Sequence, residues 1–364
     1  MTTRDIEFGL NSFGEVSRDP SGRLLSEAET VRLMIEEAVL AESVGIDLFS
    51  IGEHYRHQHV DSAGHVILAT IAGRTERIRL GTSVTVLSTQ DPVRLYAEFA
   101  TLDAASNGRA QLIVGRASST ESFPLFGFDL ADYETLFEEK LDLFTRLLRD
   151  QPVTWSGTVR SPLTDQFVRP AIAPGSIPTW VGVGGSPQSV IRAARYGLPL
   201  MLAIIGGPPS RFAPYVDLYK RALDQFEHPR LPIGMHSIGL VARTDEEARA
   251  AHWPYWEAVM KLASKERGFS VPSPDQYAAE IADGALFVGS PETVATKIAA
   301  TVRTLELSRF DLKYDLVGLP QVSRATTIEL FGREVIPRVR ELLEDEPGLS
   351  DDRVAAANNP GSHV

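Results

Sequence analysis

A glycine-rich turn that leads into a helix is the first place where residue types and spacing could do chemistry. Gly185 and Ser186 follow the apolar run 179–183, and Pro187 begins a helix that Ser186 caps. Glycine lets a ligand approach the backbone, and the free N–H groups of a first helical turn attract negative charge. Gly185, Ser186 and Ser189 therefore form a candidate phosphate site, although an ordinary turn with a capped helix has the same pattern.

Two further polar residues follow apolar runs in the way that site residues do. Arg116 comes after the run 110–114, and His54 comes after the run 47–51. An arginine beside a helix N-terminus makes a strong phosphate clamp, but an arginine at this position also fits a structural ion pair. A histidine is a candidate acid or base because its ordinary pKa lies near neutrality.

The sequence does not indicate a metal site or a nucleophile. Glu53, His54, His57 and His59 lie in one loop without a standard ligand spacing, so we expect no metal there. The chain has no cysteine, which excludes disulfides, thiolate zinc sites and cysteine nucleophiles. No serine lies in a nucleophile-elbow motif, and no P-loop lysine is present.

The composition is that of an acidic globular enzyme. Of 364 residues, 43% are hydrophobic, and 48 acidic residues outnumber 36 basic ones, which gives a net charge of -12. This charge disfavours nucleic acids and anionic membranes as partners. The N-terminal sequence lacks the pattern of a signal peptide, and no apolar run is long enough to span a bilayer. We therefore expect a cytoplasmic protein.

The candidate residues must be positioned by strands and helices that alternate along the chain. Apolar runs predict strands at 6–10, 47–51, 78–86, 110–114, 179–183, 198–205, 232–242 and 310–317. Helices are predicted at 26–44, 64–74, 92–106, 132–149, 187–196, 209–226 and 322–343, and after the caps Thr244 and Ser290. Eight such units predict a (β/α)8 TIM barrel, with the active site at the carboxyl ends of its strands. A doubly wound open sheet is the alternative, but no GxGxxG motif follows the first strand.

Two stretches depart from the regular alternation and predict insertions. The first follows the fourth strand, and its proline- and glycine-rich part before Gly175 fits a hairpin. The second, 254–283, has an interrupted helical pattern and lies between the seventh and eighth strands. We expect residues 1–345 to form a single domain, and the polar composition of 346–364 predicts a disordered tail.

Several motifs occur in an order that matches one known family. They are Ile51-Gly52-Glu53-His54-Tyr55, 78–87 with 91–94, 102–109 with 114–116, 123–127, and 182–186. Each motif alone is weak, but the ordered set resembles the bacterial luciferase-like, flavin-dependent monooxygenases over about residues 6–339. The resemblance implies a (β/α)8 barrel that binds reduced FMN or, in one branch of the family, a deazaflavin.

The resemblance assigns the candidate phosphate site to the flavin. Arg116 matches the arginine that binds the flavin phosphate. Gly185, Ser186 and Ser189 match the helix-start positions that complete this phosphate site. The family commonly forms dimers through early helices, so the resemblance also implies a homodimer that uses 61–75 and 92–106.

Further residues receive a role only from the resemblance. His54 matches a histidine that is associated with catalysis near the flavin. Ser83 and Val84 match a non-proline cis peptide beneath the isoalloxazine ring. Gly206 and Gly207 match positions close to the phosphate.

Two residues depart from the family pattern. Tyr55 stands where many members have a second histidine, which leaves His54 in place but changes the contacts available to a substrate. Ala117 stands where many members have a glycine after the arginine. The resemblance implies that a methyl group at this position either restricts the space beside the cofactor or weakens the cofactor site.

The implied function is monooxygenation. In the family, reduced FMN reacts with O2 to give a C4a-peroxyflavin, and the protein protects this species in a dry cavity while a residue such as His54 manages its proton. The substrate would be a small, largely apolar organic molecule, and a separate flavin reductase is a candidate partner. Two alternatives stay open: a deazaflavin-dependent hydride-transfer enzyme on the same barrel, and a flavin-binding protein without turnover.

Overall fold

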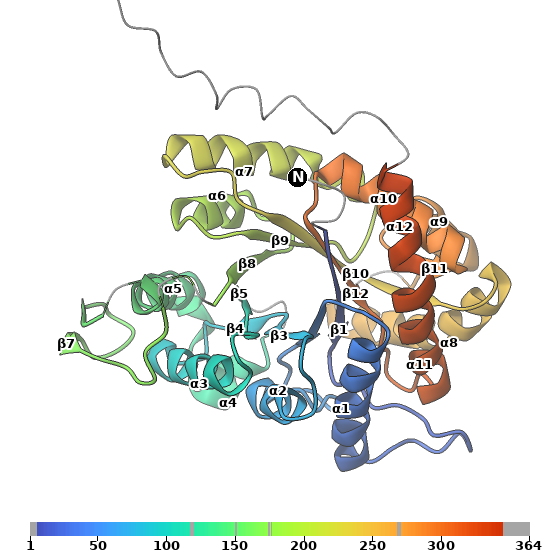
Figure 1. Cartoon of the computed structure of the whole chain (residues 1–364), viewed down its shortest axis with the longest axis horizontal. Helices are drawn as coiled ribbons and strands as arrows, with labels where there is room; N and C mark the ends of the chain where they lie inside the picture. The colour runs from blue at the N-terminus through green and yellow to red at the C-terminus, as the bar shows by residue number, and fades with distance from the viewer. Residues whose placement is uncertain are drawn as a thin grey trace, which may run out of the picture.

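The computed structural model describes residues 6–116, 120–149, 151–173, 175, 177–267 and 271–344. Its centre is a ring of parallel strands with helices outside (Figure 1). The strands follow one another in the order β3 (Arg79–Thr82), β2 (Leu48–Ile51), β1 (Glu7–Ser12), β12 (Arg309–Lys313), β10 (Ile233–Val241), β9 (Leu200–Ala203), β8 (Thr179–Val183), β5 (Leu112–Gly115) and β4 (Thr85–Val86). A parallel bridge between Leu80 and Ala110 joins the two ends of this sheet. Because β3 and β4 together make the third barrel strand, the predicted (β/α)8 barrel is confirmed.

Most helices of the outer layer begin within one residue of the predicted starts. The outer helices are α1 (Glu27–Ser43), α2 (Gly64–Ala72), α3 (Pro92–Ala105), α5 (Tyr133–Arg149), α6 (Pro187–Arg195), α7 (Ala213–Gln225), α10 (Pro291–Leu305), α11 (Gln321–Leu330) and α12 (Ile336–Glu344). The exceptions to the predicted starts are α7, which a 3-10 turn at Pro209–Phe212 precedes, and α12, which lies inside the predicted last helix. Ser26 and Glu29 form a capping box at the start of α1, and Asp91 and Ser290 cap α3 and α10 with their side chains. Each cap binds backbone N–H groups that the helix itself leaves unpaired.

Alternation along the strands separates the core from the barrel interior. Phe8, Leu10 and Phe49 belong to the large apolar cluster between the strands and the helices. The residues between them face the other way, because successive strand side chains point to opposite faces. Inside the barrel, Arg309 donates to Asp311 at 2.8 and 2.6 Å, so this buried charge is paired.

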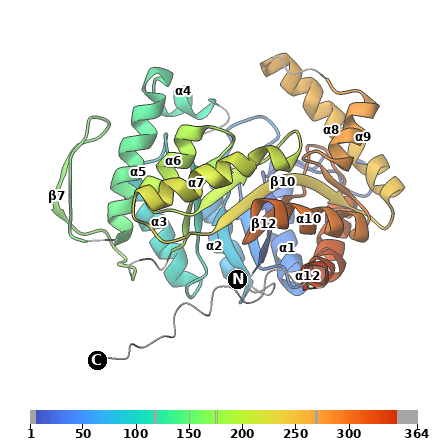
Figure 2. The same ribbon diagram turned by 90° about the horizontal axis from the view of Figure 1, so that it is seen from above.

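Both predicted insertions are present. After β5 come α4 (Ser122–Phe126), α5 and the antiparallel hairpin of β6 (Val153–Trp155) and β7 (Leu163–Gln166). Between β10 and β12 come α8 (Asp245–Arg267), α9 (Pro274–Ala282) and the short strand β11 (Phe287–Gly289). Figure 2 shows α8 and α9 standing out from one end of the barrel. They have a separate small core that contains Trp256 and Tyr277.

Three details of the chain differ from the sequence prediction. Pro254 does not begin a new segment but lies inside α8. Strand β11 was missed, since three residues carry too little pattern to predict a strand. The predicted last helix contains a π-helical turn, Phe331–Val335, between α11 and α12. The predicted tail, 346–364, lies outside the described residues.

Candidate active site

The third barrel strand breaks at the carboxyl end of the barrel, between β3 and β4. The Ser83–Val84 peptide bond at this break is cis, as the resemblance implied. A Cβ atom on Gly115 would lie 2.7 Å from Val84 Cγ2, and a Cβ atom on Gly182 would lie 2.8 Å from Val84 Cγ1. Strands β5 and β8 therefore leave out two side chains to make room for Val84 inside the barrel.

Polar contacts inside the barrel hold this break. Asn11 of β1 donates to Ser83 Oγ at 3.0 Å, and its amide also contacts His236 of β10. Burial and the nearby Lys313 lower the pKa of His236 to about 3, so its ring is neutral at physiological pH. The predicted position of Ser83 and Val84 beneath a flavin ring stays a prediction.

His54 forms a dyad with a buried carboxylate. His54 Nδ1 lies 2.8 Å from Asp61 Oδ2, and the His54 N–H donates to Asp61 Oδ1 at 3.2 Å. The side chain of Asp61 is fully buried, and burial raises its pKa. The His54 ring also packs against Phe13, with the ring centroids 4.7 Å apart. The hydrogen bond to Asp61 and the packing on Phe13 together fix the orientation of the His54 ring. The sequence analysis did not predict a role for Asp61.

The neighbours of His54 in sequence have structural partners. The Glu53 carboxylate accepts the Val86 N–H at 2.8 Å, the Gln90 amide at 3.0 Å and the Tyr55 hydroxyl at 2.8 Å. Burial and the Glu53 carboxylate raise the pKa of Tyr55. Tyr55, the departure from the family pattern, is therefore a neutral hydroxyl that ties its own loop to the third barrel strand.

Glu15 anchors the loop after β1 through buried charges. The Lys313 ammonium group donates a hydrogen bond to the Glu15 carboxylate, and Lys313 Nζ lies 3.1 Å from Asp315 Oδ1. Asp315 accepts the Phe13 N–H at 3.0 Å and the Ser12 hydroxyl at 2.7 Å. Burial alone would raise the pKa of Asp315, but Lys313 and the nearby Arg324 lower it to about 2. This network positions Phe13, which packs on His54.

The predicted phosphate cradle is open. Gly185 has a φ of 118°, which favours glycine, and a Cβ atom on Gly184 would meet nothing within 4 Å. Ser186 caps α6 by accepting the Ser189 N–H at 3.4 Å. The Ser189 hydroxyl is buried, and among the described residues it has no hydrogen-bond partner. An unpaired buried hydroxyl is costly, so a ligand oxygen at this place would fit the residues present.

Arg116 lies at the same edge and is paired. It contacts Glu134 of α5, which also accepts from Arg192 of α6 at 2.8 Å. The Arg116 guanidinium lies 5.3 Å from the centroid of the Tyr133 ring. Through Glu134, Arg116 is therefore linked to α6, as a phosphate clamp requires. The structural ion pair that the sequence offered as the alternative role of Arg116 is also present, with Glu134 as the partner. Arg192 and Glu134 were missed, although Arg192 follows Ser189 by three residues on one helix.

The second glycine turn is occupied by a carboxylate. The Gly207 N–H donates to both Glu280 oxygens, at 3.1 and 3.2 Å, and Gly207 has a φ of 72°. A Cβ atom on Gly206 would meet nothing within 4 Å. The phosphate role of this turn stays a prediction, and Ala117 lies outside the described residues.

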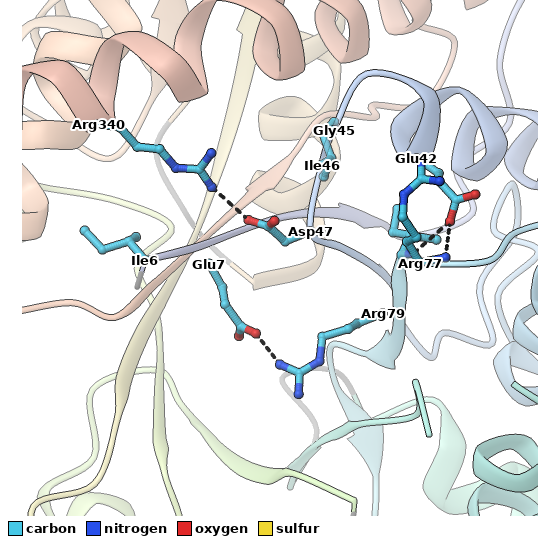
Figure 3. A pocket seen from close by; sticks show the side chains of 10 residues that line it. Ile6, Glu7, Glu42, Gly45, Ile46, Asp47, Arg77, Arg79 and Arg340 are labelled. Atoms are coloured by element: carbon cyan, nitrogen blue, oxygen red, sulfur yellow. Dashed lines mark hydrogen bonds and ion pairs between the residues drawn. The ribbon is translucent and has the colours of Figure 1, made fainter. Parts of the chain in front are cut away.

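A hollow of about 390 Å³ lies at the opposite end of the barrel, around the start of the strands. In Figure 3, Arg340 points toward Asp47 and Arg79 points toward Glu7, with both pairs forming ion pairs. Glu42 accepts three backbone N–H groups at 2.7 to 3.1 Å. None of the predicted site residues lines this hollow.

Metal ligation and membrane insertion find no support in the described ranges. Within them, no three histidine or carboxylate side chains gather closely enough to hold a metal ion. Every helix that the structure describes is too short or too polar to span a lipid bilayer.

Comparison with known proteins identifies relatives of most of the barrel. A family model described as luciferase-like monooxygenase matches residues 6–307. The 4-hydroxyprotoasukamycin monooxygenase of Streptomyces nodosus subsp. asukaensis is 32% identical over 239 residues, which are 62% of this chain and 60% of that protein. The chain spans about half to three fifths of the length of the first curated relatives that it matches.

Solved structures share the fold over nearly the whole chain. The monooxygenase RslO1 of Streptomyces bottropensis has a TM-score of 0.79 and 25% identity, covering 91% of this chain and 99% of its own. The oxygenating constituent of 3,6-diketocamphane monooxygenase of Pseudomonas putida, in complex with FMN, has a TM-score of 0.71 and 19% identity, covering 92% and 99%. The coenzyme F420 dependent tetrahydromethanopterin reductase of Methanopyrus kandleri has a TM-score of 0.66 and 18% identity, covering 92% and 99%. Both flavin and deazaflavin proteins are therefore built on this fold.

Proposed function

This chain belongs to the luciferase-like monooxygenase family, and on this premise we propose that it oxygenates a small, largely apolar organic substrate with reduced FMN and O2. The observation that carries the proposal is the open backbone at Gly184 and Gly185 beside the buried, unpartnered Ser189 hydroxyl. Arg116 lies at the same edge, so an anionic ligand would meet a positive charge, a helix N-terminus and a free hydroxyl together.

The residues of this chain divide the work between binding and proton handling. Arg116, Gly185, Ser186 and Ser189 would hold the flavin phosphate, and Val84 at the barrel mouth would support the ring system. Gly206 and Gly207 are proposed to border the phosphate, with the Gly207 amide held by Glu280. When bound, reduced FMN supplies the electrons that activate O2.

His54 is the proposed acid or base. Its Nδ1 donates to Asp61, which leaves Nε2 as the atom that accepts or returns a proton. Because the Asp61 carboxylate is fully buried, it cannot exchange this partner for water at low cost. The dyad therefore keeps one ring nitrogen available, and the packing of Phe13 against the ring restricts water.

A deazaflavin-dependent hydride transferase is the second candidate function. The shared fold with an F420-dependent reductase supports it, and that reaction needs no O2. A flavin-binding protein without turnover is the third, but the His54–Asp61 dyad gives such a protein no advantage. Homodimerisation through 61–75 and 92–106, a separate flavin reductase and a cytoplasmic location remain predictions.

Anaerobic fluorescence titration with reduced FMN, oxidised FMN and reduced deazaflavin tests the proposal. We expect the wild type to bind reduced FMN most tightly and Arg116→Ala to bind it about 10- to 100-fold more weakly, because a charged hydrogen bond to the phosphate is lost. Arg146→Ala is the matched control, since Arg146 is an exposed arginine that pairs only with Asp142 in the described structure. Preference for the deazaflavin would establish the second candidate, and binding of neither would contradict the proposal.

A further inference from the structure

One exposed carboxylate is shared between two arginines at the proposed phosphate site. Glu134 of α5 contacts Arg116 with one oxygen and Arg192 Nη2 with the other, the latter at 2.8 Å. Arg116 follows β5 and Arg192 lies on α6, so three separate elements meet at Glu134. The two guanidinium groups are brought within reach of a single anion.

The three side chains differ in exposure. Glu134 is 59% exposed, whereas Arg116 is 21% and Arg192 is 10% exposed. An exposed carboxylate can turn into water at a small free-energy cost, because surface ion pairs contribute about 0–1 kcal/mol. The buried Arg192 would keep a partner after such a change, since its Nε donates to Glu138 at 2.7 Å. Of the three side chains, Glu134 is therefore the one that can leave the cluster at the smallest free-energy cost.

Two buried polar atoms next to this cluster lack partners. Among the described residues, neither Ser189 Oγ nor Arg192 Nη1 makes a hydrogen bond. The two residues are three apart on α6 and so lie on one face of the helix. The backbone before this helix is open, because a Cβ atom on Gly184 would meet nothing within 4 Å. Glu134 therefore leaves unfilled donors that an anion with more oxygens could fill.

The charges of the cluster point to a dianion. Arg116, Arg192 and Arg195 bring three positive charges, and Glu134 and Glu138 bring two negative charges. The cluster is left with one uncompensated positive charge. If a phosphate dianion took the place of Glu134, three positive charges would face three negative ones.

We propose that Glu134 is an internal counter-anion that occupies Arg116 and Arg192 until a phosphate dianion displaces it, and that Arg192 is a second phosphate ligand. This inference rests on the proposed function, which puts the FMN phosphate at Arg116. Glu134 competes with the phosphate, so it weakens binding and keeps the two arginines paired while the site is free. The alternative is that Glu134 is a permanent tie between α5 and α6.

Glu134→Gln separates these two roles. Reduced FMN and reduced riboflavin are titrated anaerobically, because riboflavin lacks the phosphate. We expect Glu134→Gln to bind FMN about 2- to 5-fold more tightly than the wild type, the range that an exposed ion pair supports. Riboflavin binding should stay unchanged. A permanent tie predicts the reverse, with FMN binding unchanged or weakened, and this result would overturn the proposal.

Asp132→Asn is the matched control for charge. Asp132 is an exposed acidic residue two positions before Glu134, and no ion pair of the described structure involves it. Asp132→Asn changes the net charge near the site by the same amount as Glu134→Gln, but it leaves Glu134 in place on Arg116 and Arg192. Equal tightening by Asp132→Asn and Glu134→Gln would mean that only the general field changed, and this would also overturn the proposal.

Arg192→Lys tests the second ligand. This substitution keeps the positive charge but removes the planar guanidinium group, whose several N–H donors can bind Glu138 and a phosphate at the same time. We expect it to weaken FMN binding about 10-fold and to leave riboflavin binding unchanged. Equal weakening of both flavins would indicate a damaged fold and would remove Arg192 from the phosphate site.

Inorganic phosphate keeps the inference testable if the proposed function fails. Should the wild type bind neither flavin, the monooxygenase proposal falls, but thermal unfolding in phosphate against chloride at equal ionic strength still reports on the arginine pair. We expect phosphate to raise the Tm of Glu134→Gln more than that of the wild type and of Asp132→Asn. Equal shifts in all three proteins would refute displacement of Glu134.

Discussion

The two ends of the barrel both carry arginines and carboxylates, but they use them differently. At the N-terminal end, around the hollow of about 390 Å³, Arg79 pairs with Glu7 and Arg340 with Asp47. At the carboxyl end, two arginines share Glu134 while the buried Ser189 hydroxyl lacks a partner among the described residues. A hollow alone does not mark a binding site. The N-terminal hollow also has a buried donor without a partner among the described residues, Arg340 Nε, so an unfilled donor alone is not a sign of a binding site either. At the carboxyl end the unfilled Ser189 hydroxyl lies in the first turn of α6, whose free N–H groups attract the same anion.

The largest effect is expected at the dyad of His54 and Asp61. Asp61→Asn should slow the O2-dependent oxidation of bound reduced FMN about 10-fold or more, since the ring of His54 would lose the carboxylate that fixes its tautomer. FMN affinity should stay within about twofold, because in the described structure Asp61 forms no ion pair with Arg116 or Arg192. Stopped-flow absorbance measures the rate, and ¹⁵N NMR of His54 measures the tautomer.

An unchanged tautomer in Asp61→Asn would mean that Phe13 and the loop alone orient the ring. Asp129→Asn is a suitable control, since Asp129 is an exposed helix-capping carboxylate whose side chain forms no hydrogen bond with His54 or Asp61 in the described structure. It should alter neither the rate nor the NMR spectrum.

The two ends should also respond to acid in opposite directions. Asp315, with a pKa lowered to about 2 chiefly by Lys313 and Arg324 against its burial, stabilises the fold above its unfolded pKa near 4, and this stability is lost as the pH falls toward 2. Burial raises the pKa of Asp47 at the other end of the barrel, so ionisation of Asp47 opposes folding. The free energy of unfolding therefore gains from Asp47 as the pH falls and this carboxyl takes up its proton. Urea unfolding at pH 3 and pH 7 measures both effects.

Substitution should separate the two carboxylates. The loss of unfolding free energy between pH 7 and pH 3 should shrink in Asp315→Asn and grow in Asp47→Asn. If both substitutions changed this pH-dependent loss in the same direction, the assignment of a lowered pKa to Asp315 and a raised pKa to Asp47 would be wrong.

The smallest effect is expected at the N-terminal hollow. Arg340→Met should lower stability by about 1 kcal/mol or less, because the Arg340–Asp47 contact is partly exposed and 3.5 Å long. It should not change the affinity for FMN, riboflavin or inorganic phosphate. Weaker FMN binding in this variant, measured by the same titration as for Arg116→Ala, would break the contrast between the two ends.

Sequence patterns predicted the framework because their causes are local. The capping box of Ser26 and Glu29, the caps Asp91 and Ser186, and the alternation of apolar residues involve neighbours within one helical turn or one strand. These signals identified eight barrel strands and the helix that begins at the proposed phosphate cradle. They failed at Pro254 and at β11, where packing of the small core around Trp256 outweighs a weak local pattern.

The tertiary structure alone decided which side chains share a task. Asp61 meets His54 because the loop after β2 folds back on itself, and Glu134 meets Arg116 and Arg192 because α5, β5 and α6 come together. Likewise, Val84 fits inside the barrel only because Gly115 and Gly182 lack side chains on strands far along the chain. Such pairings depend on the direction and burial of groups that are distant in sequence. The sequence determined the barrel and the kinds of residues at its mouth, and the fold determined their partners, because charge and hydrogen bonding act over ångströms in space and not along the chain.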